Sequence, residues 1–242
     1  MDFRNCYEDD AYAAAYAKLE FPGTYYLAFR DLPALFARHV RGRHALDFGC
    51  GTGRSTRFLV QQGFQAVGVD IAAEMIRRAQ ASDAAGDYRV VPDGELPNFP
   101  EACFDLILSA FTFDNVPTRE KKVALFRALR RLPRPGGRIV NLVSAPEIYL
   151  HEWASFSTKD FPENRRARCG EPVRIIVTAL EDRRPAVDIL WPDDAYRDVY
   201  AEAELLVHET HRPLGRAGEP HDWISETTTA PWTIYVLGHP SG

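Results

Sequence analysis

The chain has 242 residues, of which 45% are hydrophobic, 26% charged and 12% aromatic. This composition excludes collagen, coiled coil and general disorder, and the length suits one domain with an insertion as well as two domains. The formal net charge is −5, whereas a general nucleic-acid binder normally carries a basic excess that neutralises phosphates.

The cysteines and the apolar runs narrow the class further. Cys6, Cys50, Cys103 and Cys169 are widely spaced and form no Cys-x-x-Cys pair, so we expect neither a metal site nor a redox dithiol. The acidic first residues lack a secretory apolar region, and no apolar run reaches the ~18 residues of a membrane span. A cytoplasmic protein that does not bind membranes is expected.

The first elements are predicted to be helical. Residues 11–20 favour a helix, Phe21-Pro22-Gly23 breaks it, and a helical pattern resumes over 24–42, where Gly42 is a plausible end. Residues 1–42 are therefore expected to form an N-terminal helical cap.

From residue 44 onwards, short apolar strands alternate with helices. Strands are predicted at 44–49, 65–70, 88–91, 104–110 and 137–144, with helices at 55–63, 72–81 and 119–132. This alternation is typical of βαβ units and predicts an α/β fold, a doubly wound parallel sheet with helices on both faces. In such a sheet, ligands bind beyond the carboxyl ends of the strands.

The second half has a different pattern. Residues 147–172 are irregular and rich in aromatic residues, and the strands 173–180 and 186–191 form a predicted antiparallel hairpin. A helix at 193–205 and strands at 205–214 and 230–237 follow. Because long structureless loops in compact domains are usually functional, we expect residues 146–200 to be a lid inserted over the ligand crevice.

A glycine turn, Gly49-Cys50-Gly51-Thr52-Gly53, joins the first strand of this region to its helix. Such a turn allows a sharp bend and close approach of a ligand, although a tight turn alone would need the same residues. The dinucleotide fingerprint requires a small residue where Arg54 stands. A nicotinamide-dependent oxidoreductase is therefore the weaker alternative.

The order of motifs resembles that of the class I S-adenosylmethionine (SAM)-dependent methyltransferases. Residues 40–59, VRGRHALDFGCGTGRSTRFL, resemble the first motif, and VGVDIAAEMI (67–76) resembles the second. VVPDGELPNFPEACFDLILSAF (90–111) resembles the third and fourth, and LPRPGGRIV (132–140) resembles the approach to the fifth strand. The resemblance covers roughly residues 40–145 and implies a Rossmann-like sheet in which residues 230–237 supply one late antiparallel strand.

The resemblance also implies roles for individual residues. Asp70 would hold the ribose, Asp93 would lie near the adenine amino group, and Asp47 would face the amino-acid part of SAM. The other residues expected to contact SAM are Gly49, Cys50, Gly51, Thr52, Gly53, Ile71, Met75, Gly94, Ser109, Ala110 and Phe111. Two structural alternatives remain open, because Asp70 could cap the helix at 72–81 and Asp93-Gly94 could form a simple turn.

Tyr26 and Arg30 are further candidates for binding SAM. They stand at positions i and i+4 of a predicted helix and share one face of it. A guanidinium group suits the SAM carboxylate, but a surface arginine beside core tyrosines would show the same pattern.

Candidates for the methyl acceptor site follow the fourth and fifth strands. Asp114, Asn115, Tyr149, His151 and Trp153 could orient a substrate, and His151 or Glu147 could accept its proton. A lone histidine is more often structural, so these two are weak candidates and the catalytic base is otherwise unknown.

Two motifs that the sequence lacks narrow the class of methyl acceptor. Residues after 104–110 read SAFTFDNVP, without the [DN]-P-P-[YF] tetrapeptide of amino-methylating nucleic-acid enzymes or a Pro-Cys nucleophile. With the acidic charge, this absence favours a small-molecule acceptor and no nucleic acid. A non-catalytic SAM-binding protein and a nucleic-acid or protein methyltransferase remain alternatives.

One methyltransferase domain is expected over 1–242, as a monomer or homodimer. Its parts would be the cap 1–42, the SAM-binding core 43–145, the lid 146–200 and the last two strands within 201–242.

Overall fold

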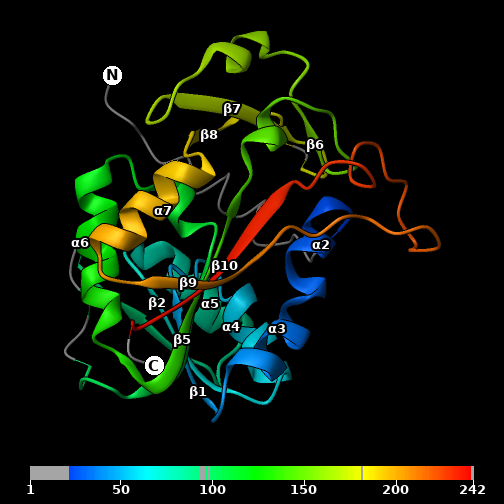
Figure 1. Cartoon of the computed structure of the whole chain (residues 1–242). Coiled ribbons are helices and arrows are strands. Elements are labelled where there is room, and N and C mark those ends of the chain that lie inside the picture. Colours follow the sequence, from blue (N-terminus) through cyan, green and yellow to red (C-terminus); the bar gives the residue numbers. More distant parts are fainter. Residues whose placement is uncertain (1–21, 93–95, 97–98, 181, 241–242) are drawn as a thin grey trace.

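The computed structural model describes residues 22–92, 96, 99–180 and 182–240. A large sheet crosses the molecule with helices on both faces, and a small sheet lies beyond one end of it (Figure 1). The helix predicted at 11–20 lies outside the described residues. None of the helices in the described part of the chain has both the length and the apolar character to cross a bilayer.

The large sheet has the order β3-β2-β1-β4-β5-β10-β9. Its strands are β1 (His44–Phe48), β2 (Gln65–Asp70), β3 (Asp87–Val90), β4 (Phe104–Ala110), β5 (Pro133–Ser144), β9 (Leu206–His211) and β10 (Trp232–Gly238). The first five are parallel, and β10 is antiparallel to both β5 and β9. The predicted Rossmann-like sheet with one antiparallel late strand is confirmed.

Helices cover the sheet on two sides because neighbouring residues of a strand point to opposite faces. In β1, Ala45 packs with α2, α3 and α4, whereas Leu46 packs with α6 and α7. The helices are α2 (Thr24–Arg30), α3 (Leu32–His39), α4 (Arg54–Gln61), α5 (Ala73–Ser82), α6 (Arg119–Arg130) and α7 (Asp193–Glu202). The short turns are η2 (Thr112–Asn115), η3 (Pro146–Tyr149) and η4 (Pro162–Arg166).

Several elements differ in extent from the prediction, and two of these differences have a clear structural reason. The helix expected over 24–42 is divided at Asp31 into α2 and α3, and Pro33 lies in the first turn of α3, where its missing N–H costs nothing. The fifth strand begins at Pro133 rather than at 137, because Pro133 already pairs with Phe104 before the register shifts.

The small sheet has the order β6-β7-β8, with β6 (Phe156–Ser157), β7 (Pro172–Val177) and β8 (Ala186–Ile189). The antiparallel hairpin predicted from the sequence is confirmed as β7 and β8. Buried side chains of β6 and β7 pack with those of β10. Within the segment 146–200, α7 instead packs with α6 over the large sheet.

Candidate active site

Between β1 and α4 the chain turns through three glycines. Gly49, Gly51 and Gly53 have φ angles of 74°, 53° and 81°, a region that other residues adopt only at a cost. The N–H of Gly49 donates to the carbonyl of Val69 at 2.8 Å, which holds the turn against β2. A Cβ atom built at Gly51 would meet no atom within 4 Å. The backbone at Gly51 is therefore open to a ligand.

Asp47 ties β1 to α4. It is fully buried, and its Oδ2 accepts hydrogen bonds from the hydroxyls of Ser55 and Thr56, each at 2.6 Å. Burial raises the pKa of this carboxyl to about 6. Its Oδ1 is also buried and has no hydrogen-bond partner among the described residues.

Asp70 connects the glycine turn to α5. Its Oδ2 accepts the N–H of Gly51 at 2.8 Å, and its Oδ1 accepts the N–H of Ala72 at 2.9 Å, just before α5 begins. Burial raises the pKa of the carboxyl, while these backbone donors lower it. Asp70 therefore orders the residue before α5 without capping the helix, since the N-cap is Ala72 and no side chain caps α5, and the same carboxyl borders a cavity.

This main cavity has a volume of about 760 Å³ and lies at the carboxyl ends of β1, β2 and β4. Its size is within the range of small-molecule and cofactor sites. Most of the predicted SAM-contacting residues line it: Gly49, Cys50, Gly51, Thr52, Asp70, Ile71, Met75, Ala110 and Phe111. Four motifs that are far apart in the sequence therefore meet at one edge of the sheet.

Other predicted residues lie beside the main cavity rather than in its wall. Gly53 packs against the ring of Tyr88, which an added Cβ would approach to 2.7 Å. Ser109 is fully buried in β4. Asp93 and Gly94 lie outside the described residues, although Pro92 lines the main cavity directly before them.

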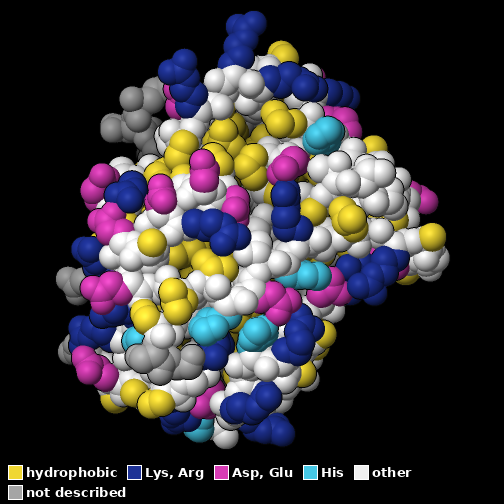
Figure 2. Space-filling view, in the orientation of Figure 1, with side chains coloured by type: hydrophobic (Ala, Val, Ile, Leu, Met, Phe, Trp, Pro, Cys, Tyr) yellow, Lys and Arg dark blue, Asp and Glu magenta, His cyan; other side chains and the backbone are white. Residues whose placement is uncertain are grey.

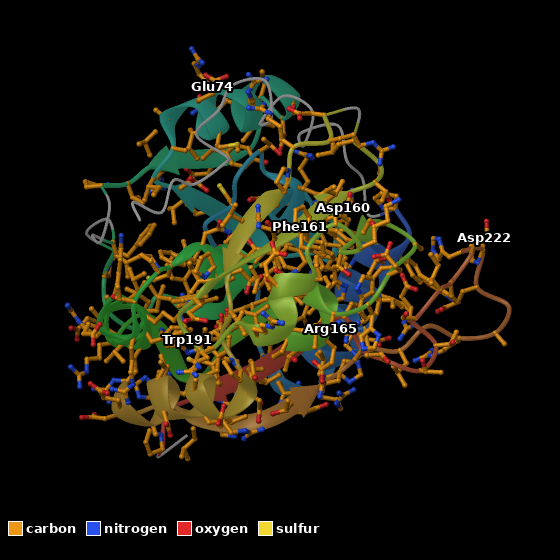
Figure 3. The ribbon with its side chains drawn as sticks, turned by 90° about the horizontal axis from the view of Figure 1, so that it is seen from above. Glu74, Asp160, Phe161, Arg165, Trp191 and Asp222 are labelled. Carbon is orange, nitrogen blue, oxygen red and sulfur yellow. The ribbon has the colours of Figure 1, made fainter. Side chains whose placement is uncertain are left out.

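Tyr26 and Arg30 share a helix face, as predicted, but this face contacts the loop that follows β9. The Tyr26 ring lies 4.7 Å from that of His221, and the guanidinium of Arg30 is 2.8 Å from Glu219. The same loop projects at the edge of the molecule, where Asp222 is labelled in Figure 3. Neither Tyr26 nor Arg30 is among the residues that line the main cavity.

Arg54 is a cation of the cavity wall that the sequence argument did not assign to the site. It is the first residue of α4, and its guanidinium lies 5.1 Å from the ring centre of Tyr25 and 5.8 Å from that of Phe29. The sequence signal was its position directly after the glycine turn. From the sequence, Arg54 indicated only that the dinucleotide fingerprint is incomplete.

A second, smaller chamber of about 30 Å³ lies between the large and small sheets. Asp114, Asn115 and Tyr149, three of the predicted acceptor-site residues, line it. Phe111 and Asn115 belong to the walls of both the main cavity and the chamber, so the two spaces are neighbours.

The other acceptor candidates lie away from these spaces. His151 is exposed, and Trp153 is buried with its Nε1 donating to the carbonyl of Ile148 at 2.8 Å. Glu147 forms an ion pair with Arg212 at 2.8 Å. None of these three predicted residues is among those lining the main cavity or the chamber.

Two charged residues at the chamber were missed from the sequence. Asp188 of β8 lines it, and Lys122 of α6 is fully buried nearby, with its Nζ 4.8 Å from the ring centre of Trp191. Figure 3 labels Trp191 between β8 and α7. The position of Lys122 held a signal, because it shares the apolar face of α6 with Leu125 and Phe126 at helical spacing. Asp188 stands in a short predicted strand and gave no comparable signal.

The strand order, the glycine turn after β1 and the carboxylate at the end of β2 define the class I methyltransferase fold. Solved structures agree: the chain aligns with the CcbJ methyltransferase from Streptomyces caelestis over 96% of its length and 97% of that protein, with a TM-score of 0.66 at 16% identity. At this identity, the likeness shows the fold alone.

Sequence comparisons also find methyltransferases. Residues 46–141 match the family described as "Methyltransferase domain". The chain is 26% identical over 187 residues to N-demethylindolmycin N-methyltransferase of Streptomyces griseus, covering 76% of this chain and 78% of that one. It is 35% identical over 101 residues to an uncharacterized methyltransferase of Geobacillus kaustophilus, covering 41% of this chain and 46% of that one.

Residues 46–141 therefore carry a methyltransferase domain on a class I fold, and the protein is a SAM-dependent methyltransferase with SAM as its methyl donor. This assignment decides against the nicotinamide-dependent oxidoreductase. The residues present suit SAM, because the glycine backbone leaves room for close approach and Asp70 borders the main cavity. Asp47, which was expected to face the amino-acid part of SAM, is fully buried and is not among the residues that line the main cavity.

Proposed function

We propose that the protein methylates a small-molecule acceptor that enters the main cavity beside SAM. The observation that carries this proposal is the extent of the main cavity. Beyond the four motifs, its wall continues to Phe29, Asn115 and Leu125, which no SAM motif supplied. This additional wall provides space and apolar surface for a second ligand.

The chain would act mainly by positioning. SAM supplies a methyl group that is already activated on a sulfonium centre. Protein residues then need to align the acceptor and exclude water, and alignment alone can contribute roughly 7–11 kcal/mol. The aromatic and aliphatic wall of the main cavity provides such a water-poor environment.

The charge distribution supports a small acceptor over a nucleic acid. Arg54 and Lys121 are the Lys and Arg residues in the described lining of the main cavity. On the face shown in Figure 2, basic side chains are interspersed with acidic and uncharged ones. Phosphate recognition depends on many clustered cations.

The relatives also support a small acceptor. The N-methyltransferase of Streptomyces griseus named above acts, by its name, on N-demethylindolmycin. We extend from it only the broad class of acceptor, a small molecule.

Two measurements test the proposal. Calorimetry should detect binding of S-adenosylhomocysteine and none of NADH. Isotope-labelled SAM should then label the small-molecule fraction of a cell extract, and not its protein, DNA or RNA. Labelling confined to a macromolecular fraction would overturn the small-molecule proposal while leaving the family assignment intact.

A further inference from the structure

The chamber beside the main cavity has walls of aromatic rings. Tyr25, Phe111, Phe156 and Trp232 line it and contact one another, with ring centres 4.8 Å apart for Phe111 and Trp232 and 4.9 Å apart for Tyr25 and Phe156. These rings come from α2, the end of β4, β6 and β10. The faces of such rings carry negative charge density and attract cations.

Two carboxylates complete the walls of the chamber. Asp114 is 4% exposed, and both of its oxygens receive the backbone N–H of Ser144, at 3.1 and 3.3 Å. Asp188 accepts the hydroxyl of Tyr149 at 3.0 Å. A carboxylate has about four acceptor sites, so both groups keep capacity for a further donor. Asp188 is partly exposed and lines the chamber.

The buried charges of this region do not balance. Lys122 is the buried cation whose charge acts on both Asp114 and Asp188. Its Nζ donates to the carbonyl of Phe113 and lies 5.3 Å from the ring centre of Tyr196. Among the described groups, two carboxylates therefore share one ammonium. Burial raises the pKa of both carboxyls, and repulsion from Asp114 raises that of Asp188 further.

A further polar atom faces the same region without a partner. The Oδ1 of Asn115 is buried and accepts no hydrogen bond from the described residues. Asn115 lines both the chamber and the main cavity.

We propose that the chamber binds the basic nitrogen of the acceptor, and hence that the protein is an N-methyltransferase for a small amine. This inference rests on the small-molecule function proposed above. The aromatic rings and the surplus carboxylate both favour a cation and disfavour an anionic or neutral oxygen acceptor. About 30 Å³ is room for a group the size of one water or amine, so the body of the acceptor lies in the main cavity.

The chemistry balances with these groups. An amine that binds as an ammonium ion transfers one proton to a carboxylate of the chamber and becomes a neutral nucleophile. Its lone pair then forms the new N–C bond while the C–S bond of SAM breaks and its electron pair stays on sulfur. The product leaves as a methylated ammonium ion, and the carboxylic acid returns its proton to water.

The test compares probes that differ in one group. 2-Phenylethylamine, 2-phenylethanol and 3-phenylpropionate are titrated by calorimetry into the full chain saturated with S-adenosylhomocysteine. We expect the amine to bind, and the alcohol and the acid to bind about tenfold more weakly or not at all. Equal binding of amine and alcohol, preferred binding of the acid, or no binding of the amine would overturn the proposal.

Variants locate the binding group. Asp188→Asn should weaken amine binding about tenfold or more, leave S-adenosylhomocysteine binding unchanged and leave alcohol binding unchanged. Asp198→Asn, an exposed carboxylate on α7, is the matched control and should change nothing. If Asp188→Asn does not fold, Asp114→Asn is used with the same expectation. An unchanged amine affinity in the folded variant would overturn the assignment.

A turnover screen separates this inference from the proposed function. Labelled SAM is supplied with pools of primary and secondary amines, alcohols, phenols and carboxylic acids. Methylation confined to amines supports the inference. Methylation of a phenol or an acid alone would overturn the amine inference and keep the small-molecule function. Absence of S-adenosylhomocysteine binding would instead contradict the function itself.

Discussion

The main cavity and the neighbouring chamber are built in different ways. Much of the wall of the main cavity comes from short sequence motifs, each at the end of a strand. Part of this wall is backbone, as at Gly49 and Gly51. The chamber is built from side chains of distant elements: Tyr25 lies on α2, Asp188 on β8 and Trp232 on β10. A backbone site needs fixed local spacing, whereas a side-chain site needs only that the fold brings its members together.

This difference predicts where mutations should act. Changes in the glycine turn should abolish SAM binding, and changes in the chamber should alter the acceptor. The two sites should therefore respond separately to mutation.

Gly51→Val should weaken binding of S-adenosylhomocysteine by about 100-fold or more, corresponding to about 2.7 kcal/mol. The valine side chain would fill the open space through which the ligand approaches the backbone of Gly51. The positive φ of Gly51 adds strain to any residue with a side chain. Calorimetry gives the affinity. Gly136→Val is the matched control, because Gly136 also has a positive φ and open space but lies in β5 away from the cavity. Equal effects of the two variants would attribute the loss to strain alone.

Asp70→Ala should weaken the same binding by on the order of 1.5–3 kcal/mol, through loss of a charged acceptor. It should also lower the melting temperature, since Asp70 accepts the N–H groups of Gly51 and Ala72. Calorimetry and thermal unfolding measure the two effects separately. Asp87→Ala, an exposed residue at the start of β3, should change neither by much. Unchanged affinity with a lowered melting temperature would leave Asp70 with a structural role alone.

Asp47 should make the free energy of unfolding depend on pH between about 4 and 6. Its folded pKa, about 6, exceeds the ordinary value of 3.8, so the native state binds the proton more tightly than the unfolded state. This contribution to stability is therefore present at low pH and lost as the pH rises through 6, by on the order of 3 kcal/mol. Urea unfolding of wild type and Asp47→Asn across this range should show a steeper fall for wild type. Parallel curves would contradict the assignment.

Arg54→Gln should weaken binding of S-adenosylhomocysteine about tenfold, about 1.4 kcal/mol, if its guanidinium holds the ligand carboxylate. Arg30→Gln should leave the affinity unchanged, because Arg30 pairs with Asp31 and Glu219 outside the cavity wall. The two variants together show whether Arg30, which was expected from helical spacing, or Arg54, which borders the main cavity, binds the ligand. A loss of affinity in Arg30→Gln alone would restore the original expectation.

His151→Ala should have the smallest effect, within about 0.5 kcal/mol on stability. The side chain is exposed and is absent from the described walls of the main cavity and the chamber. Turnover on an amine identified by the screen should equal that of wild type. A fall in turnover with unchanged affinity for S-adenosylhomocysteine would return His151 to the acceptor site.

Much of the cofactor half could be predicted because its signals are local. The glycine spacing, an acid at the end of β2 and alternating strands and helices each follow from a short stretch of chain. Arg30 shows the limit of such reasoning. Helical spacing correctly placed it on the same face as Tyr26, but what that face contacts depends on a loop nearly 190 residues away.

The sequence by itself determined the fold class and the position of the glycine turn, because backbone geometry restricts which residues stand there. It indicated the cofactor through the resemblance of its motifs to those of the SAM-dependent methyltransferases. Only the tertiary structure placed Asp188 and the four aromatic rings around one chamber with Lys122 nearby, and only it showed that His151 and Trp153 do not line the described walls of the main cavity or the chamber. The physical reason is that side-chain chemistry in a cavity depends on distance in space. Residues from α2, β8 and β10 become neighbours only when the sheets pack.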